Sequence, residues 1–230
     1  MTASIHLPVK LSPSDLTFLW DECKRCFYLK YVHGINRPAA PFPGIFGVID
    51  KLMKEYFQDR QSAELDAALP AGRVQFGERW VESASIQIQG TSRQGFIRGK
   101  FDTVIAFADQ SYGVVDFKTL EPRPEHIAFY WRQLHAYAYA LEHAAAGKFS
   151  LSPVSKLGLL VVTPRKMEMT ASGQIAYLGG VTWLEVPFDE VAFLNFLGEV
   201  LTLLDRPEPP PAGEKCVYCQ YRQQSRQHAW

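Results

Sequence analysis

Two apolar runs that alternate like β-strands are each interrupted by an acidic residue, and this most constrains the fold of the chain. Residues 96–107 carry Asp102, and residues 112–120 carry Asp116 and Lys118. Period-two alternation predicts two neighbouring strands. A charge inside a strand that should be buried is costly unless it pairs or holds an ion. We therefore expect the two strands to bring two carboxylates and one ammonium group together.

These groups are suited to the hydrolysis of a phosphodiester. Mg²⁺ and Mn²⁺ prefer oxygen ligands, and the carboxylates of Asp102 and Asp116 with the backbone carbonyl of Phe117 can supply them. Lys118 lies two positions after Asp116, so both side chains point to the same face of the strand. Its ammonium group can orient the attacking water or stabilise developing negative charge. The alternative is that the acids merely end their strands and that Lys118 is a solvated partner.

The remaining pattern predicts an α/β (α+β) fold with a central mixed sheet flanked by helices. Helices are expected over 13–31, 48–58, 125–143 and 188–204, and further strands over 83–89, 156–163 and 175–186. The stretch up to residue 79 is expected to be helix plus loop. We predict one domain over 1–230, with N-terminal helices in 11–60, a core in 83–204, and a Pro-rich linker with a cysteine-bearing tail in 205–230.

The formal net charge is zero, so a nucleic-acid-binding surface would have to be a local basic patch. The sequence contains neither the apolar segment of a signal peptide nor an apolar run approaching the roughly 20 residues of a membrane span. We expect a soluble, cytoplasmic protein without membrane contact. Disulfides are not expected in that compartment.

Four cysteines form two Cys-x-x-Cys pairs at opposite ends of the chain, Cys23 with Cys26 and Cys216 with Cys219. This spacing predicts a tetrathiolate metal site that ties the first helix to the tail. Thiolate ligation suits either an iron–sulfur cluster or zinc. Taken alone, the cysteines would also fit a structural or redox metalloprotein, or buried free thiols.

In these residues the sequence resembles the PD-(D/E)XK nucleases, and in particular the RecB-type branch. That branch includes the nuclease domains of bacterial recombination helicases and the CRISPR-associated RecB-like exonucleases. The matching positions follow one another in the order of the family: Ser12-Pro13-Ser14, Cys23, Phe27, Tyr28, Gly99, Asp102, Asp116, Lys118, Gln133 and Tyr137.

The resemblance implies a restriction-endonuclease-like core and a Mg²⁺- or Mn²⁺-dependent deoxyribonuclease, acting as an exonuclease on single-stranded or frayed-end DNA. It assigns catalytic roles to Asp102, Asp116, Lys118, Gln133 and Tyr137. The family usually has a histidine ligand on the second helix, where this chain has Asp50, a hard oxygen donor that also suits these metals. This departure motivates an alternative, a catalytically degenerate nuclease fold that serves as a DNA-binding or assembly module.

Many RecB-type nucleases hold a [4Fe–4S] cluster with one early and three late cysteines. Cys23, Cys216 and Cys219 match three of these positions, and Ser225 stands at the fourth. We expect Cys26 to replace the missing ligand, so a [4Fe–4S] cluster is predicted, with zinc as the alternative. Without metal, the tail after Pro211 is expected to be loose.

The expected partners are DNA and proteins of a recombination, CRISPR or phage DNA-processing complex. Candidate contacts to the DNA backbone are Lys100, Arg132, Arg165 and Lys166, and also Lys24, Arg25, Lys30 and Arg98. Aromatic side chains can stack on the bases of a single strand. The candidates for this role are Tyr130, Trp131 and Tyr137.

Overall fold

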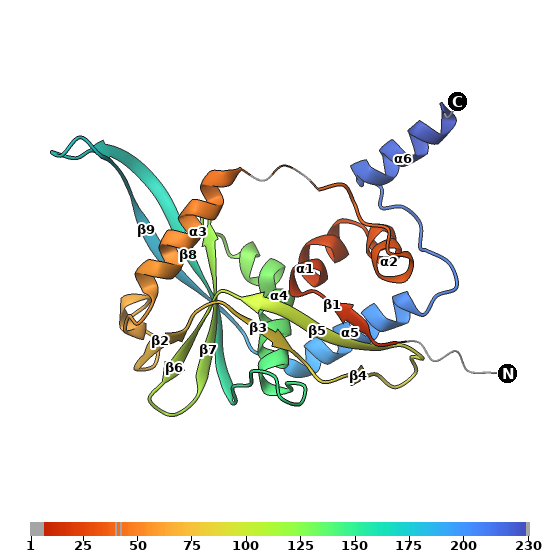
Figure 1. Ribbon diagram of the computed structural model, residues 1–230, viewed down its shortest axis with the longest axis horizontal. Coiled ribbons are helices and arrows are strands. Elements are labelled where there is room, and N and C mark those ends of the chain that lie inside the picture. The colour runs from red at the N-terminus through yellow and green to blue at the C-terminus, as the bar shows by residue number, and fades with distance from the viewer. Residues whose placement is uncertain (1–6, 40, 42, 229–230) are drawn as a thin grey trace.

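A five-stranded mixed sheet forms the centre of the computed structural model, which describes residues 7–39, 41 and 43–228 (Figure 1). Its strands follow the order β2 (Gly72–Phe76), β6 (Thr103–Phe107), β7 (Tyr112–Thr119), β8 (Val154–Met169) and β9 (Ile175–Val186). The β7–β8 pair is parallel and the other pairs are antiparallel. The expected mixed sheet is therefore confirmed.

A second sheet is built around β5 (Gln94–Phe101). Strand β1 (Val9–Leu11) pairs with β5 in parallel, and β3 (Arg79–Glu82) and β4 (Ile86–Gln87) pair with it antiparallel. The prediction of one strand over 96–107 was wrong, because the chain leaves this sheet after Phe101 and enters the central sheet at Thr103. Asp102 lies between the two strands, at the junction of the sheets.

The described residues form six α-helices and one short 3₁₀ helix over Ser62–Glu64. The α-helices are α1 (Pro13–Glu22), α2 (Lys24–His33), α3 (Gly44–Phe57), α4 (Glu125–Glu142), α5 (Glu190–Leu204) and α6 (Val217–Gln227). The single helix predicted over 13–31 was wrong. Its backbone is extended at Cys23, with φ −167° and ψ 108°, so α1 ends there and α2 begins.

Three further boundaries differ from the prediction. The stretch before residue 79, predicted to be helix plus loop, contains the 3₁₀ helix over Ser62–Glu64 and also strand β2, so strands begin before residue 83. The tail after the linker is helical, as α6. The strand expected over 83–89 is reduced to the two residues of β4.

The two faces of the central sheet have different cores. Val114 belongs to the core on the α4 side, which includes Leu134 and Leu141 of α4. Val115 and Phe117 point to the opposite face, where Phe117 stacks on Phe57 of α3 with ring centroids 5.7 Å apart. Because side chains alternate along a strand, Asp116 and Lys118 share the face of Val114, towards α4.

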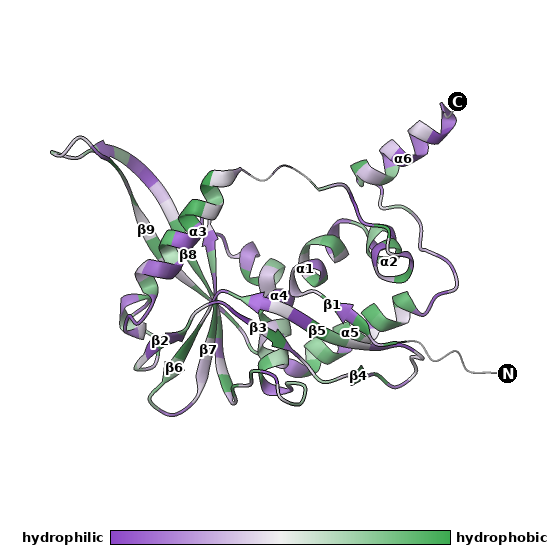
Figure 2. Ribbon diagram, viewed as in Figure 1, coloured by the Kyte–Doolittle hydropathy of each residue, from purple (hydrophilic) through white to green (hydrophobic). Residues whose placement is uncertain are grey.

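The outer halves of β8 and β9 extend beyond the body of the molecule as a two-stranded arm (Figure 1). The colouring by hydropathy is mostly hydrophilic along the β8 side of this arm and apolar where the strands enter the core (Figure 2). In the described part of the chain, no helix combines the length and the apolar character that a membrane crossing requires.

Candidate active site

Asp102 is positioned by the edge of β7. The pairing of β6 with β7 ends with Thr103 opposite Val115. Two residues further along β7, the backbone N–H of Phe117 donates to Asp102 Oδ2 over 2.9 Å. The side chain of Asp102 thus takes the place of a strand partner. The N–H and C=O groups of one strand residue point to the same side, so the carbonyl of Phe117 also lies on the side of Asp102.

Asp116 and Lys118 form a buried ion pair on the opposite side of the β7 backbone from Phe117. Asp116 is 3% exposed. Burial and the nearby carboxylate of Asp102 raise its pKa and the ammonium group of Lys118 lowers it, and the net result is a pKa of about 6. Burial lowers the pKa of Lys118, but the attraction of Asp116 outweighs this effect and the net shift is upward. The ring of Tyr130 covers the lysine, 4.7 Å from Nζ to the centroid.

Helix α4 presents Gln133 and Tyr137 to this pair. Gln133 Nε2 donates to Asp116 Oδ1 over 3.4 Å, whereas Gln133 Oε1 is buried and has no hydrogen-bond partner among the residues described. Tyr137 is buried, and burial raises the pKa of its hydroxyl, as does the charge of Asp116. A Cβ atom on Gly99 would lie 2.7 Å from Pro13 Cδ and 3.0 Å from Tyr137 Cε1. The glycine of the Gly-x-x-Asp motif therefore lets α1 and α4 approach β5.

Sequence reasoning missed Lys54 on α3, which joins three carboxylates. Its Nζ lies 2.6 Å from Asp50 Oδ2, 2.7 Å from Glu78 Oε1 and 2.8 Å from Asp102 Oδ1. Burial lowers the pKa of Lys54, but hydrogen bonds to Asp102, Asp50 and Glu78 raise it above its ordinary value. The four-residue spacing of Asp50 and Lys54 on a helix was a visible signal. Nothing in the sequence linked either residue to Glu78 or Asp102.

The donor atoms at this site fit a hard divalent cation. Asp102 and Asp116 supply carboxylate oxygens, and the orphaned Oε1 of Gln133 is a buried acceptor that lacks a donor. Such an acceptor is destabilising unless a cation or a water molecule satisfies it. Asp50, the predicted additional ligand, contacts Lys54 in this structure and lines a cavity of about 390 Å³ together with Lys51, Lys54, Glu55 and Glu78.

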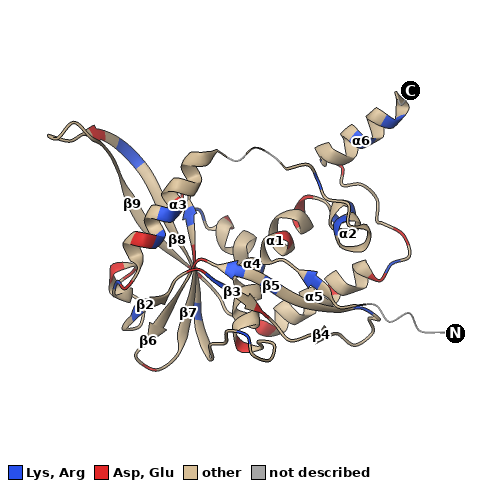
Figure 3. Ribbon diagram, viewed as in Figure 1, with Lys and Arg blue, Asp and Glu red and all other residues tan. Residues whose placement is uncertain are grey.

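The predicted DNA-binding residues are scattered over the surface. Lys100 pairs with Glu78, and Arg132 pairs with Asp21 over 2.5 Å. Arg165 and Lys166 lie on the β8 side of the arm, where positive residues are marked in Figure 3. Arg165 is exposed, and Lys166 pairs with Glu168.

Several other predicted contacts are already engaged within the protein. Lys30 pairs with Asp15, and Arg98 pairs with Glu82. Lys24 lies over the ring of Trp20. The aromatic side chains predicted to stack on bases are packed inward: Tyr130 and Tyr137 are buried, and Trp131 packs on His135 with ring centroids 4.4 Å apart.

The four cysteines meet between α2 and α6, as their spacing predicted. All four are buried, and their sulfur atoms lie within 4.8 Å of one another. Cys26 Sγ lies 3.7 Å from Cys216 Sγ and 3.6 Å from Cys219 Sγ, and Cys23 Sγ lies 3.8 Å from Cys219 Sγ. The tail is thus joined to the N-terminal helices, as expected.

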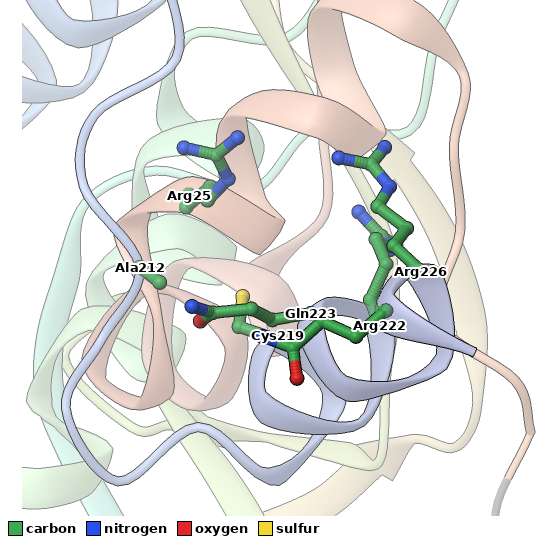
Figure 4. A pocket seen from close by; sticks show the side chains of 7 residues that line it. Arg25, Ala212, Cys219, Arg222, Gln223 and Arg226 are labelled. Carbon is green, nitrogen blue, oxygen red and sulfur yellow. The ribbon is translucent and has the colours of Figure 1, made fainter. Parts of the chain in front are cut away.

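Beside the cysteines, α6 and α2 enclose a cavity of about 360 Å³ that carries arginines and no carboxylate (Figure 4). It is lined by Arg25, Ala212, Cys219, Arg222, Gln223, Arg226 and Gln227. Arg25 donates to the carbonyl of Pro210 over 3.1 Å, which fixes the linker against α2. Among the described residues, Arg222 and Arg226 have no carboxylate partner.

The family model described as the PD-(D/E)XK nuclease superfamily matches residues 51–224, a span that includes Asp102, Asp116 and Lys118. The chain belongs to the PD-(D/E)XK nuclease superfamily. The mixed α/β fold is that expected for a core of this superfamily, whose members are typically nucleases. A solved structure described as "Crystal structure of SSO0001" is similar to the chain, with 17% sequence identity and a TM-score of 0.49. The match covers 95% of this chain and 86% of the chain in that structure. No curated protein matches the chain.

Proposed function

We propose that the chain is a Mg²⁺- or Mn²⁺-dependent deoxyribonuclease of the RecB type. The observation that carries the proposal is the placement of Asp116, a fully buried acid held between Lys118 and Gln133. Asp102 stands at the adjoining sheet junction, fixed by the amide of Phe117. A strongly perturbed acid such as Asp116, beside a buried lysine, is typical of active sites, where ionisation is tuned for chemistry.

Each side chain has a distinct task in this proposal. Asp102, Asp116 and the Phe117 carbonyl would hold the divalent ion, which when bound supplies Lewis acidity and a more acidic water. Lys118 stabilises negative charge that develops on the phosphate, from a site where burial strengthens its electrostatic effect. Gln133 keeps the carboxylate of Asp116 oriented through its Nε2 group.

The pKa of Asp116, about 6, leaves this carboxylate ionised at neutral pH. Its protonation would remove a ligand charge and weaken the hold on the cation, because metal ligands must be deprotonated. Cleavage is therefore expected to fall as the pH drops below about 6. Tyr137 packs beside Gly99, and we assign it to the packing that holds α4 over the site.

We propose DNA with single-stranded or frayed ends as the substrate and exonucleolytic cleavage as the mode, following the RecB-type motifs. Local basic features support a backbone contact on a chain of zero net charge: Arg165 on the arm, and the arginine-lined cavity beside α6. Protein partners in recombination, CRISPR or phage DNA processing belong to the same proposal.

The test is cleavage of end-labelled single- and double-stranded DNA with Mg²⁺, Mn²⁺ or chelator. Lys118→Met should abolish cleavage and keep the fold, as followed by circular dichroism. Lys148→Ala is the matched control, since Lys148 is an exposed lysine paired with Glu82 away from the candidate site. Full activity of the Lys118→Met variant, or cleavage in excess chelator, would contradict the proposal. The product ladder reports the direction of attack.

One observation favours a second candidate function, a DNA-binding module without cleavage. The ammonium group of Lys54 already contacts three carboxylates, including Asp102, where a divalent cation would compete with it. DNA binding in a gel-shift assay, with no cleavage at any Mg²⁺ or Mn²⁺ concentration, would support this alternative.

A further inference from the structure

The two Cys-x-x-Cys pairs occupy equivalent positions at the starts of two helices. Cys23 is the N-cap of α2 and Cys216 is the N-cap of α6, and Cys26 and Cys219 lie in the first turn of each helix. The positive end of each helix dipole therefore faces the sulfur atoms, which favours their thiolate form. The two pairs meet face to face, with all four sulfurs within 4.8 Å.

The distances between the sulfurs distinguish a single ion from a cluster. Four sulfurs bound at about 2.3 Å to one tetrahedral zinc are about 3.8 Å apart. Three of the sulfur–sulfur separations here are 3.6, 3.7 and 3.8 Å, and all of them are within 4.8 Å. In a [4Fe–4S] cluster each thiolate binds a different iron on the outside of the core, which places the sulfurs roughly 6 Å apart. The site is thus too small for that cluster and matches the size of a single-ion site.

The surroundings supply donors to the sulfurs. The amide of Gly213 donates to Cys23 Sγ and the Nη2 group of Arg37 donates to Cys216 Sγ, both over 3.4 Å. Arg37 is itself anchored by an ion pair with Glu22 and lies over the ring of Tyr218, 4.6 Å from its centroid. One divalent ion with four thiolates carries excess negative charge, and such outer donors stabilise it.

We propose that Cys23, Cys26, Cys216 and Cys219 bind one zinc ion as a closed tetrathiolate site, in place of the iron–sulfur cluster that the resemblance implies. Four protein ligands leave no open coordination position, so the ion is structural. It holds α6 against α2 and thereby forms the wall of the arginine-lined cavity to which Cys219 belongs. The inference does not depend on the proposed nuclease activity.

The test is metal analysis of the full chain, expressed with both iron and zinc supplied and purified without oxygen. We expect one zinc per chain, no acid-labile sulfide and no visible absorption. Replacement by Co²⁺ should give the ligand-field and thiolate charge-transfer bands of a tetrahedral tetrathiolate site. About four irons and matching sulfide per chain, or protein free of metal under these conditions, would overturn the proposal.

Variants address the ligand set. Cys26→Ser should lower the zinc content, whereas Ser225→Ala should keep one zinc, since the Ser225 hydroxyl donates to the carbonyl of Arg222 and not to a cysteine. If Cys26→Ser does not fold, titration of the wild-type chain with an organic mercurial remains informative. Release of one zinc as the four thiols are modified supports the site, and complete modification of the thiols without zinc release contradicts it.

Discussion

Asp116→Asn should stabilise the folded chain while abolishing catalysis. The substitution keeps the shape of the side chain and removes a charge that is buried in the wild type. The pKa of Asp116 rises from its ordinary value of 3.8 to about 6 on folding. Each pKa step of one corresponds to about 1.36 kcal/mol, so the ionised carboxylate lowers the free energy of unfolding by about 3 kcal/mol at neutral pH. An amide at this position avoids that cost.

The sign of the effect follows from proton linkage. Between pH 3.8 and about 6 the folded state binds the Asp116 proton and the unfolded state does not, so stability falls as the pH rises through this window. The cost is therefore complete above about pH 6 and absent below 3.8. The advantage of Asp116→Asn should be largest at pH 7.5 and should shrink steadily as the pH is lowered towards 4.

Urea unfolding in chelator, repeated across this pH range, measures the effect without stabilisation by bound metal. Glu208→Gln is the matched control, because Glu208 is exposed and the same acid-to-amide change there should shift stability by less than about 0.5 kcal/mol. A variant that is less stable than the wild type at pH 7.5, or a difference that does not vary with pH, would refute the argument from burial.

Three further perturbations test other features. Lys54→Met removes the cation from a cluster of carboxylates, so Mn²⁺ should bind about tenfold more tightly by calorimetry, or about 1.4 kcal/mol; unchanged affinity would separate Lys54 from the metal site. Gly99→Ala forces a Cβ atom against two packed side chains, so urea unfolding should show a loss of about 1–3 kcal/mol in the free energy of unfolding. The control is Gly47→Ala, where the added Cβ atom meets open space on α3 and should raise the free energy of unfolding by up to about 1 kcal/mol. Arg222→Ala combined with Arg226→Ala should weaken the binding of single-stranded DNA, measured by fluorescence anisotropy. The slope of log K against log salt concentration should become shallower by about 1.4, and an unchanged slope would exclude the cavity as a DNA contact.

The alternating runs and the motif order were enough to predict the fold class. The strand periodicity around Asp116 identified β7, and the long amphipathic pattern identified α4 within a few residues. Local patterns failed to predict the boundary between two elements of the same type when no turn residues separate them. Residues 96–107 carry only Asp102 as an interruption, yet they serve two sheets: β5 ends at Phe101 and β6 begins at Thr103, with the Asp102 side chain accepting from the Phe117 amide where the β6–β7 pairing stops.

The helix over 13–31 failed for a related reason. Its apolar periodicity continues through Cys23, but the backbone there is extended and starts a new helix. That break is what allows Cys23 and Cys26 to take N-cap and first-turn positions facing α6. Local periodicity cannot predict this break, because the contact that goes with it is made with residues at the other end of the chain.

The amino-acid sequence by itself determined which chemical groups the chain carries and their order along it: two acids and a lysine in one strand-rich region, an amide and a phenol four residues apart on a helix, and two thiol pairs. The tertiary structure alone decided their distances and their surroundings. It placed Lys54 and Glu78 beside Asp102, buried Asp116 beneath α4, and brought the four sulfurs within 4.8 Å of one another. The physical reason is that coordination, charge pairing and desolvation depend on separations of a few ångströms between residues far apart in the chain, and local periodicity carries no information about those separations.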